Sequence, residues 1–173
     1  MTRKKTNIGE HLDLLLQVNN DLAISVSLDH ALDTLVNITS SVIGAERGTV
    51  FIHDSETQEL YSRVAQGNLS REIRVMSNQG IAGWVFTNNT GAIVAEAYKD
   101  DRFHKSVDMR TGYRTKSILC APLRTVSGEI IGVTQLLNKI NDKFTQKDLN
   151  LLESITEQAT IAIQGHLIQE KME

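Results

Sequence analysis

Two strongly apolar runs, at residues 118–123 and 130–137, lie close together in the last third of the chain. Both have the β-branched and aliphatic composition that is typical of strands. Ser127 and Gly128 lie between them and supply the residue types of a tight turn. The pattern predicts an antiparallel hairpin. Any fold of this chain has to contain that hairpin.

Four shorter segments also have a composition that favours strands. They lie at residues 49–52, 60–64, 73–75 and 92–95. Polar turn residues at 54–57 separate the first two, which therefore form a second predicted hairpin. Between residues 96 and 116 the chain becomes polar and highly charged. A loop of this length inside a compact domain is usually functional.

Three segments have the apolar spacing of helices. One begins at Ser27, whose side chain can cap it, and ends at Gly44, which enters the left-handed cap conformation without strain. A short helix is predicted at 80–86, and a long one begins at Thr145. The order of elements predicts an α+β domain, with an antiparallel sheet covered by helices on one face and a pocket under loops on the other. A chain of 173 residues with 40% hydrophobic side chains suits one such domain.

An additional helix is predicted at the N-terminus, where apolar residues recur in steps of four and three. The seam consists of Ile8, Leu12, Leu15, Leu22 and Val26, with Asn19 at the remaining position. Such a helix either lies on its own domain or pairs with its copy in another chain. Residues 158–169 carry no formal charge, so we expect the second face of the last helix to be covered too, by the first helix or by a partner chain. We therefore divide the chain into a dimerising helix at 1–26, a domain at 27–165 and a helical extension at 166–173.

Composition excludes several classes of function. The net charge of -3 lacks the positive excess of a dedicated nucleic-acid binder. The single cysteine, Cys120, lies inside an apolar run, so neither a disulfide framework nor a thiol nucleophile is expected. No histidine has metal-ligand spacing, and no serine or glycine pattern matches a catalytic or phosphate-binding motif. Without a membrane span or a secretory signal, we expect a cytoplasmic protein that binds a small molecule and is not an enzyme.

Five motifs in the same order as in a known family give a sharper expectation. They are Gln-Gly-Ile-Ala-Gly at 79–83, Asp-Arg-Phe at 101–103, Thr-Gly-Tyr-Arg-Thr at 111–115, the run at 118–123 and Gly-Val-Thr-Gln-Leu-Leu-Asn-Lys at 132–139. Together they resemble a GAF domain, most closely the cyclic-nucleotide-binding GAF domains of phosphodiesterases and bacterial adenylyl cyclases. The resemblance covers roughly residues 28–163. It implies a six-stranded antiparallel sheet, with terminal helices on one face and a ligand held under short helices on the other.

The resemblance also implies which residues meet the ligand: Thr49, Gln66, Ile81, Ala82, His104, Asp108, Thr111, Thr115 and Gln135. Gln66 matches the position that reads the purine edge, and a glutamine amide can both donate to and accept from adenine, which favours cyclic AMP over cyclic GMP. The N–H groups of Ile81 and Ala82 match those that meet the cyclic phosphate at a helix start. We expect Asp108→Ala to lower affinity without lowering the melting temperature.

Taken alone, these residue types permit a plainer interpretation. Asp108, Thr111 and Thr115 are spaced by three and four, as on a solvated helix face. His104 alone fits an exposed loop, and Gln66 alone fits a strand end. Trp84 stands where the family commonly has a histidine, and it could narrow or cover the pocket.

The resemblance assigns a structural role to a second set of residues: Asn138, Lys139, Phe144 and Asp148. In the family the lysine and the aspartate form an ion pair that holds the pocket without touching the ligand. Leu149 replaces the glutamate that usually follows the aspartate, and it continues the apolar seam of the last helix.

Two functions remain open at this stage. In the first, a cyclic nucleotide orders the polar segment, and the terminal helices of a homodimer pass the change to an effector of unknown kind. In the second, the domain binds no nucleotide and serves as a dimerising spacer.

Overall fold

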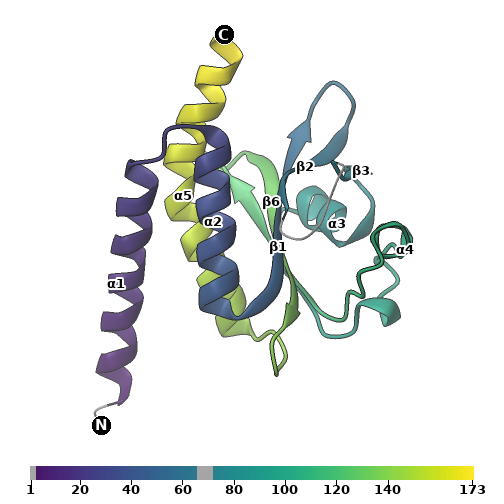
Figure 1. The fold of residues 1–173 in the computed structure, drawn as a ribbon, viewed down its shortest axis with the longest axis horizontal. Coiled ribbons are helices and arrows are strands. Elements are labelled where there is room, and N and C mark those ends of the chain that lie inside the picture. Colours follow the sequence, from purple (N-terminus) through teal and green to yellow (C-terminus); the bar gives the residue numbers. More distant parts are fainter. Residues whose placement is uncertain (1–2, 66–71) are drawn as a thin grey trace.

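The computed structural model describes residues 3–65 and 72–173. Its centre is one antiparallel sheet of six strands in the order β3-β2-β1-β6-β5-β4 (Figure 1). The strands are β1 Ala45–Asp54, β2 Glu59–Ala65, β3 Arg74–Met76, β4 Ala92–Val94, β5 Ile118–Arg124 and β6 Ile130–Lys139. Both predicted hairpins are present, β1 with β2 and β5 with β6. The predicted α+β fold is confirmed.

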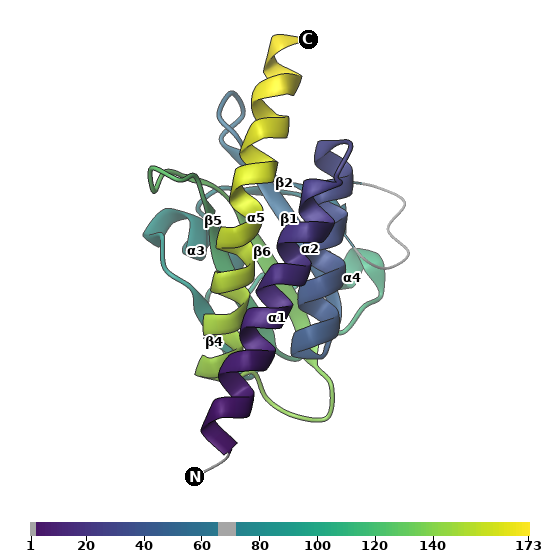
Figure 2. The ribbon, with the colours of Figure 1, turned by 90° about the vertical axis from the view of Figure 1, so that its left-hand side faces the viewer.

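The helices divide between the two faces of the sheet. On one face lie α1 Arg3–Ala23, α2 Leu28–Ile43 and α5 Gln146–Met172 (Figures 1 and 2). On the other face lie α3 Gly80–Asn88, the 3-10 turn η1 Ala97–Lys99 and α4 Ser106–Thr111. The polar segment at 96–116 thus contains two short helical pieces that its composition did not predict. We call residues 96–116 the lid.

Local chemistry fixes the ends of the long helices. The hydroxyl of Ser27 accepts a hydrogen bond from the N–H of His30 at 3.1 Å, and Gly44 ends α2 with a φ of 81°. Both caps of α2 are as predicted. At the start of α5, Thr145 and Asp148 cap each other's backbone N–H groups in a capping box. These caps satisfy N–H and C=O groups that a helix end otherwise leaves unpaired.

The seam predicted for α1 is only partly right. Leu15 and Leu22 do pack on the domain, but Val18, which the seam left out, is fully buried with them. Leu12 is 55% exposed, Asn19 is exposed, and Val26 lies beyond the end of the helix. The reason is that α1 contacts both α2 and α5, which turns a neighbouring stripe of the helix inward (Figure 2). Two interpretations of this helix were left open, that it lies on its own domain or that it pairs with a copy in another chain. The buried stripe shows that α1 lies on its own domain.

In the described part of the chain, no helix has both the length and the apolar character needed to cross a bilayer.

Candidate ligand-binding site

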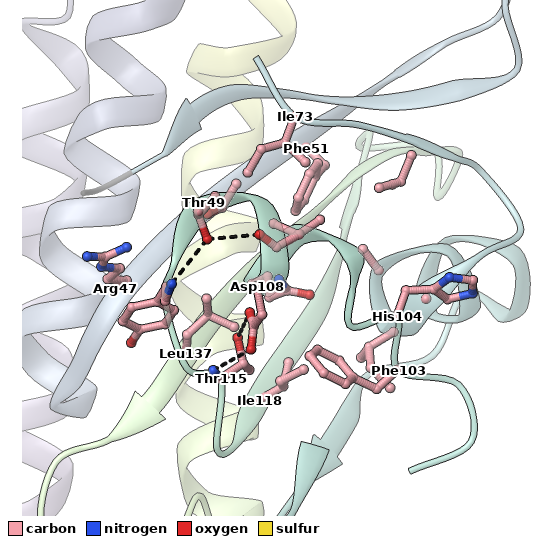
Figure 3. A pocket seen from close by; sticks show the side chains of 18 of the residues that line it. Arg47, Thr49, Phe51, Ile73, Phe103, His104, Asp108, Thr115, Ile118 and Leu137 are labelled. Carbon is pink, nitrogen blue, oxygen red and sulfur yellow. Dashed lines mark hydrogen bonds between the residues drawn. The ribbon is translucent and has the colours of Figure 1, made fainter. Parts of the chain in front are cut away.

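A pocket lies between the sheet, the start of α3 and the lid (Figure 3). The space between its lining residues, counted together with the part open to solvent, is about 810 Å³. Eight of the nine expected ligand residues line it: Thr49, Ile81, Ala82, His104, Asp108, Thr111, Thr115 and Gln135. The ninth, Gln66, lies outside the described residues.

The floor of the pocket is the sheet itself. Thr49 on β1 and Gln135 on β6 are direct register partners, so their side chains lie next to each other on one face. Phe51, Ile118 and Leu137 add apolar surface around them. The floor therefore offers a hydroxyl and an amide within an apolar surround, which suits a ligand with a flat apolar part and a few polar atoms.

The start of α3 forms one wall. The first three N–H groups of any helix have no acceptor within it, and in α3 they belong to Gly80, Ile81 and Ala82. The side chain of the preceding residue, Gln79, makes no capping hydrogen bond. Gly83 allows this tight start, because a Cβ there would lie 2.9 Å from the backbone carbon of Asn78. Such a helix start favours an anion.

The lid forms the opposite wall through a buried hydrogen-bond cluster. The carboxylate of Asp108, which is 7% exposed, accepts a hydrogen bond from the Thr115 hydroxyl at 2.7 Å and one from the Thr115 N–H at 2.7 Å (Figure 3). A third hydrogen bond comes from the hydroxyl of Tyr98 at 2.7 Å. Asp108 and Thr115 are therefore not on a solvated face, whereas Thr111 is exposed.

The same cluster changes one expectation from the sequence. Alanine at position 108 would leave the buried Thr115 N–H without its acceptor, and an orphaned buried donor costs about 1–3 kcal/mol. We therefore revise that expectation and expect Asp108→Ala to lower the melting temperature of the ligand-free protein as well.

Sequence reasoning missed two polar residues of the pocket, Arg47 and Tyr113. The guanidinium of Arg47 lies 3.9 Å from the centre of the Tyr113 ring. The Tyr113 hydroxyl donates to Glu46 at 2.7 Å. Burial and this hydrogen bond raise the pKa of Tyr113, and the hydrogen bonds from Tyr113 and Asn138 lower the pKa of Glu46. Alternation along β1 could have found Arg47, because it lies two residues before Thr49 and so on the same face.

The structural motif joins three elements beneath the pocket. The Lys139 ammonium forms an ion pair with Asp148 at 3.1 Å and donates to the carbonyl of Ile43 at the end of α2. Phe144 is buried between β6 and α5, in the same cluster as Leu149. The ion pair that the resemblance implied is thus present, and it connects α2, β6 and α5.

Trp84 does not line the pocket. Its ring lies under the guanidinium of Arg102, at 4.5 Å, and Arg102 in turn makes two hydrogen bonds to Asp100 at 2.9 and 2.7 Å. The indole therefore supports the start of the lid and leaves the cavity open.

Cys120 is fully buried in β5, and burial raises the pKa of its thiol. Among the described residues, no three His, Cys, Asp or Glu side chains gather where they could hold a metal ion.

Comparison with known proteins identifies the fold and its relatives. The family model of the GAF domain matches residues 27–163. The chain belongs to the GAF family. It is 30% identical to a probable 3′,5′-cyclic phosphodiesterase of Caenorhabditis elegans over 93% of this chain and 23% of that protein. It is 32% identical to a dual 3′,5′-cyclic-AMP and -GMP phosphodiesterase of Takifugu rubripes over 88% of this chain and 18% of that protein. This GAF chain thus spans less than a quarter of the length of these relatives.

Solved structures confirm the GAF fold. A GAF domain from a phosphoenolpyruvate-protein phosphotransferase of Coxiella burnetii aligns with a TM-score of 0.82 at 18% identity, covering 93% of this chain and 96% of that one. The free methionine-R-sulfoxide reductase of Neisseria meningitidis aligns with a TM-score of 0.78 at 16% identity, covering 92% and 91%. The second of these is an enzyme, so the fold alone does not decide between binding and catalysis.

Proposed function

We propose that this GAF domain is a regulatory module that binds a cyclic nucleotide in the pocket described above and does not transform it. The observation that carries the proposal is that eight residues, chosen for their match to ligand-binding positions, line one cavity. The similarity to a probable 3′,5′-cyclic phosphodiesterase and to a phosphodiesterase named for both cyclic AMP and cyclic GMP supports the ligand class.

The charges of the pocket favour an anionic ligand. Four charged or titratable side chains line it: Arg47, His104, Asp108 and Tyr113. The Asp108 carboxylate is already met by three donors from the lid. None of the ion pairs within 3–65 and 72–173 includes Arg47, so no direct ion pair there competes with a ligand for its guanidinium, which lies on the Tyr113 ring. Together with the helix start of α3, this cation gives a phosphate two places to bind.

The remaining polar groups suit a nucleoside. Thr49 and Gln135 on the floor and Thr111 and Thr115 on the lid can exchange hydrogen bonds with a ribose or a base edge. The apolar surface of Phe51, Ile118 and Leu137 suits a purine face. Our preference for cyclic AMP rests on Gln66, whose amide can serve adenine.

Isothermal titration calorimetry with cyclic AMP and cyclic GMP tests the proposal. We expect both nucleotides to give binding heat, with a higher affinity for cyclic AMP than for cyclic GMP. In Arg47→Gln we expect the affinity to fall about tenfold, because one charge-assisted contact is removed. The matched control is Arg110→Gln, an exposed arginine on the lid that does not line the pocket and should leave affinity unchanged. Absence of heat and of thermal stabilisation from either nucleotide at millimolar concentration would reject the ligand class.

We further propose that the domain acts as a homodimer and relays its ligand state to an effector through the terminal helices. Apolar side chains remain exposed on the outer helices: Leu12 (55%) and Leu16 (60%) on α1, and Ile161 (72%) and Ile168 (54%) on α5. Exposed apolar residues gathered on neighbouring helices are typical of interfaces.

Analytical ultracentrifugation provides the measurement for the dimer. We expect the chain to sediment as a dimer, and Leu16→Glu with Ile161→Glu to shift it to a monomer because two charges would be buried without partners. Met109→Glu on the lid, where the side chain is 83% exposed, serves as the control and should leave the dimer intact. A monomeric wild-type chain at tens of micromolar would contradict this part of the proposal, and a dimer indifferent to ligand would favour the spacer function.

A further inference from the structure

Tyr98 does not line the pocket, but it forms a hydrogen bond to a residue that does. It lies on η1 and is absent from the residues that line the cavity. Its hydroxyl donates to Oδ2 of Asp108 at 2.7 Å, and Asp108 does line the cavity. The hydrogen bond therefore leads from a part of the lid outside the pocket to a carboxylate that lines the pocket.

The Asp108 carboxylate depends on neutral donors. None of the ion pairs of the described residues includes it, and only 7% of the residue is exposed to solvent. A buried charge is stable only when hydrogen bonds replace its lost hydration. Two of its three donors belong to Thr115 and the third is Tyr98, so removing the Tyr98 hydroxyl takes away one third of that replacement.

The ring of Tyr98 is itself held in place by its neighbours in the lid. The guanidinium of Arg114 lies 3.9 Å from the ring centre, and the ammonium of Lys105 lies 5.4 Å from it. The ring centre of Phe103, which does line the pocket, is 5.2 Å away. The hydroxyl of Tyr98 therefore has a fixed position from which to orient the carboxylate.

The hydrogen bonds also connect three separate pieces of the lid. Tyr98 comes from η1, Asp108 from α4, and Thr115 from the segment that leads into β5. Apolar packing of Ala97, Tyr98 and Phe103 also holds the lid, and the bonds to Asp108 add polar contacts between its three pieces. Asp108 uses three of the roughly four acceptor positions of a carboxylate, which leaves one for a donor on a ligand.

We infer that Tyr98 is a positioning residue for ligand binding, which fixes the orientation of Asp108 and thereby sets the affinity of the pocket from outside it. This inference rests on the proposed function, from which it takes the cyclic nucleotide as the ligand. The alternative on the same contacts is that a ligand displaces Tyr98 from Asp108. The two arrangements predict opposite effects of removing the hydroxyl.

The test is Tyr98→Phe in the 173-residue chain, with two measurements. Calorimetry with cyclic AMP and cyclic GMP measures affinity, and amide hydrogen exchange by NMR measures the Thr115 N–H in the ligand-free protein. We expect affinity to fall about tenfold, because a hydrogen bond to a charged group is lost. We expect the Thr115 amide to exchange about tenfold faster, because its acceptor is no longer held. Tyr61→Phe is the matched control, since Tyr61 is half-buried on β2 and does not line the pocket.

A double-mutant cycle separates positioning from general loosening of the lid. If Tyr98 acts through Asp108, then Tyr98→Phe should cost little further affinity in a chain that already carries Asp108→Asn. Additive losses, tighter binding or unchanged affinity in Tyr98→Phe would each overturn the inference. If neither nucleotide binds the wild-type chain, the proposed function fails, and an unchanged Thr115 exchange rate in Tyr98→Phe then overturns the inference by itself.

Discussion

Gly132→Ala is expected to destabilise the domain by about 3 kcal/mol or to prevent folding. Gly132 lies on β6 opposite Ile52 of β1, at the centre of the sheet. A Cβ on Gly132 would lie 2.1 Å from the carbonyl oxygen of Phe51 and 3.2 Å from its carbonyl carbon. Both atoms are backbone atoms of the neighbouring strand, so the clash can be relieved only by separating β1 from β6.

Urea denaturation followed by circular dichroism provides the measurement, with Gly165→Ala as the control. Gly165 lies within α5, and nothing is within 4 Å of the position that its Cβ would take. Alanine in an open helical position stabilises by about 0.5–1 kcal/mol. The two substitutions add the same methyl group, and we expect them to shift the free energy of unfolding in opposite directions. An unchanged midpoint for Gly132→Ala would show that β1 and β6 do not approach as closely as described.

Most of the fold could be predicted because its signals are local. The strand composition of β1, β2, β5 and β6 and the caps at Ser27 and Gly44 each depend on a few neighbouring residues. The seam of α1 depends instead on which helices lie beside it. A heptad count fixes the spacing of the apolar residues but not the stripe that the tertiary contacts bury, and Val18 is buried because α5 and α2 are both present.

In the candidate site, too, local signals could be predicted from the sequence and tertiary contacts could not. The resemblance assigned Ile81, Ala82 and Gln135 to ligand positions, and all three line the pocket; each lies on a regular element whose start or alternation can be read along the chain. Spacing alone misjudged Asp108 and Thr115. Helical spacing suggested that Asp108 and Thr115 share a solvated face. The helix α4 ends at Gly112, with a φ of 73°, and Thr115 lies beyond its end. Thr115 is instead hydrogen-bonded to Asp108. Tyr113 was missed because its partner, Glu46, is 67 residues away.

Asn138→Ala is expected to lower the free energy of unfolding by about 3 kcal/mol, although the side chain does not line the pocket. Asn138 is 4% exposed, and its amide oxygen accepts from the N–H groups of Lys116 and Ser117 at 2.6 and 3.1 Å. Its amide nitrogen faces the Glu46 carboxylate, the Tyr113 hydroxyl and the Arg114 carbonyl, at 3.1, 2.9 and 2.9 Å. This one side chain therefore fastens the end of the lid to β1 and β6.

The backbone conformation of Asn138 adds to the stability that Asn138→Ala loses, and a glycine variant separates this contribution from the loss of the side-chain hydrogen bonds. Its φ is 59°, in the left-handed region, where alanine is strained by about 1–2 kcal/mol and glycine is not. Asn138→Gly should therefore recover about 1 kcal/mol relative to Asn138→Ala, and both variants should speed the amide exchange of Lys116 and Ser117. If Asn138→Gly and Asn138→Ala are equally stable, the backbone conformation makes no contribution. Unchanged exchange at Lys116 would mean that Asn138 does not hold the lid, and the wall of the pocket at Thr115 would then need another anchor.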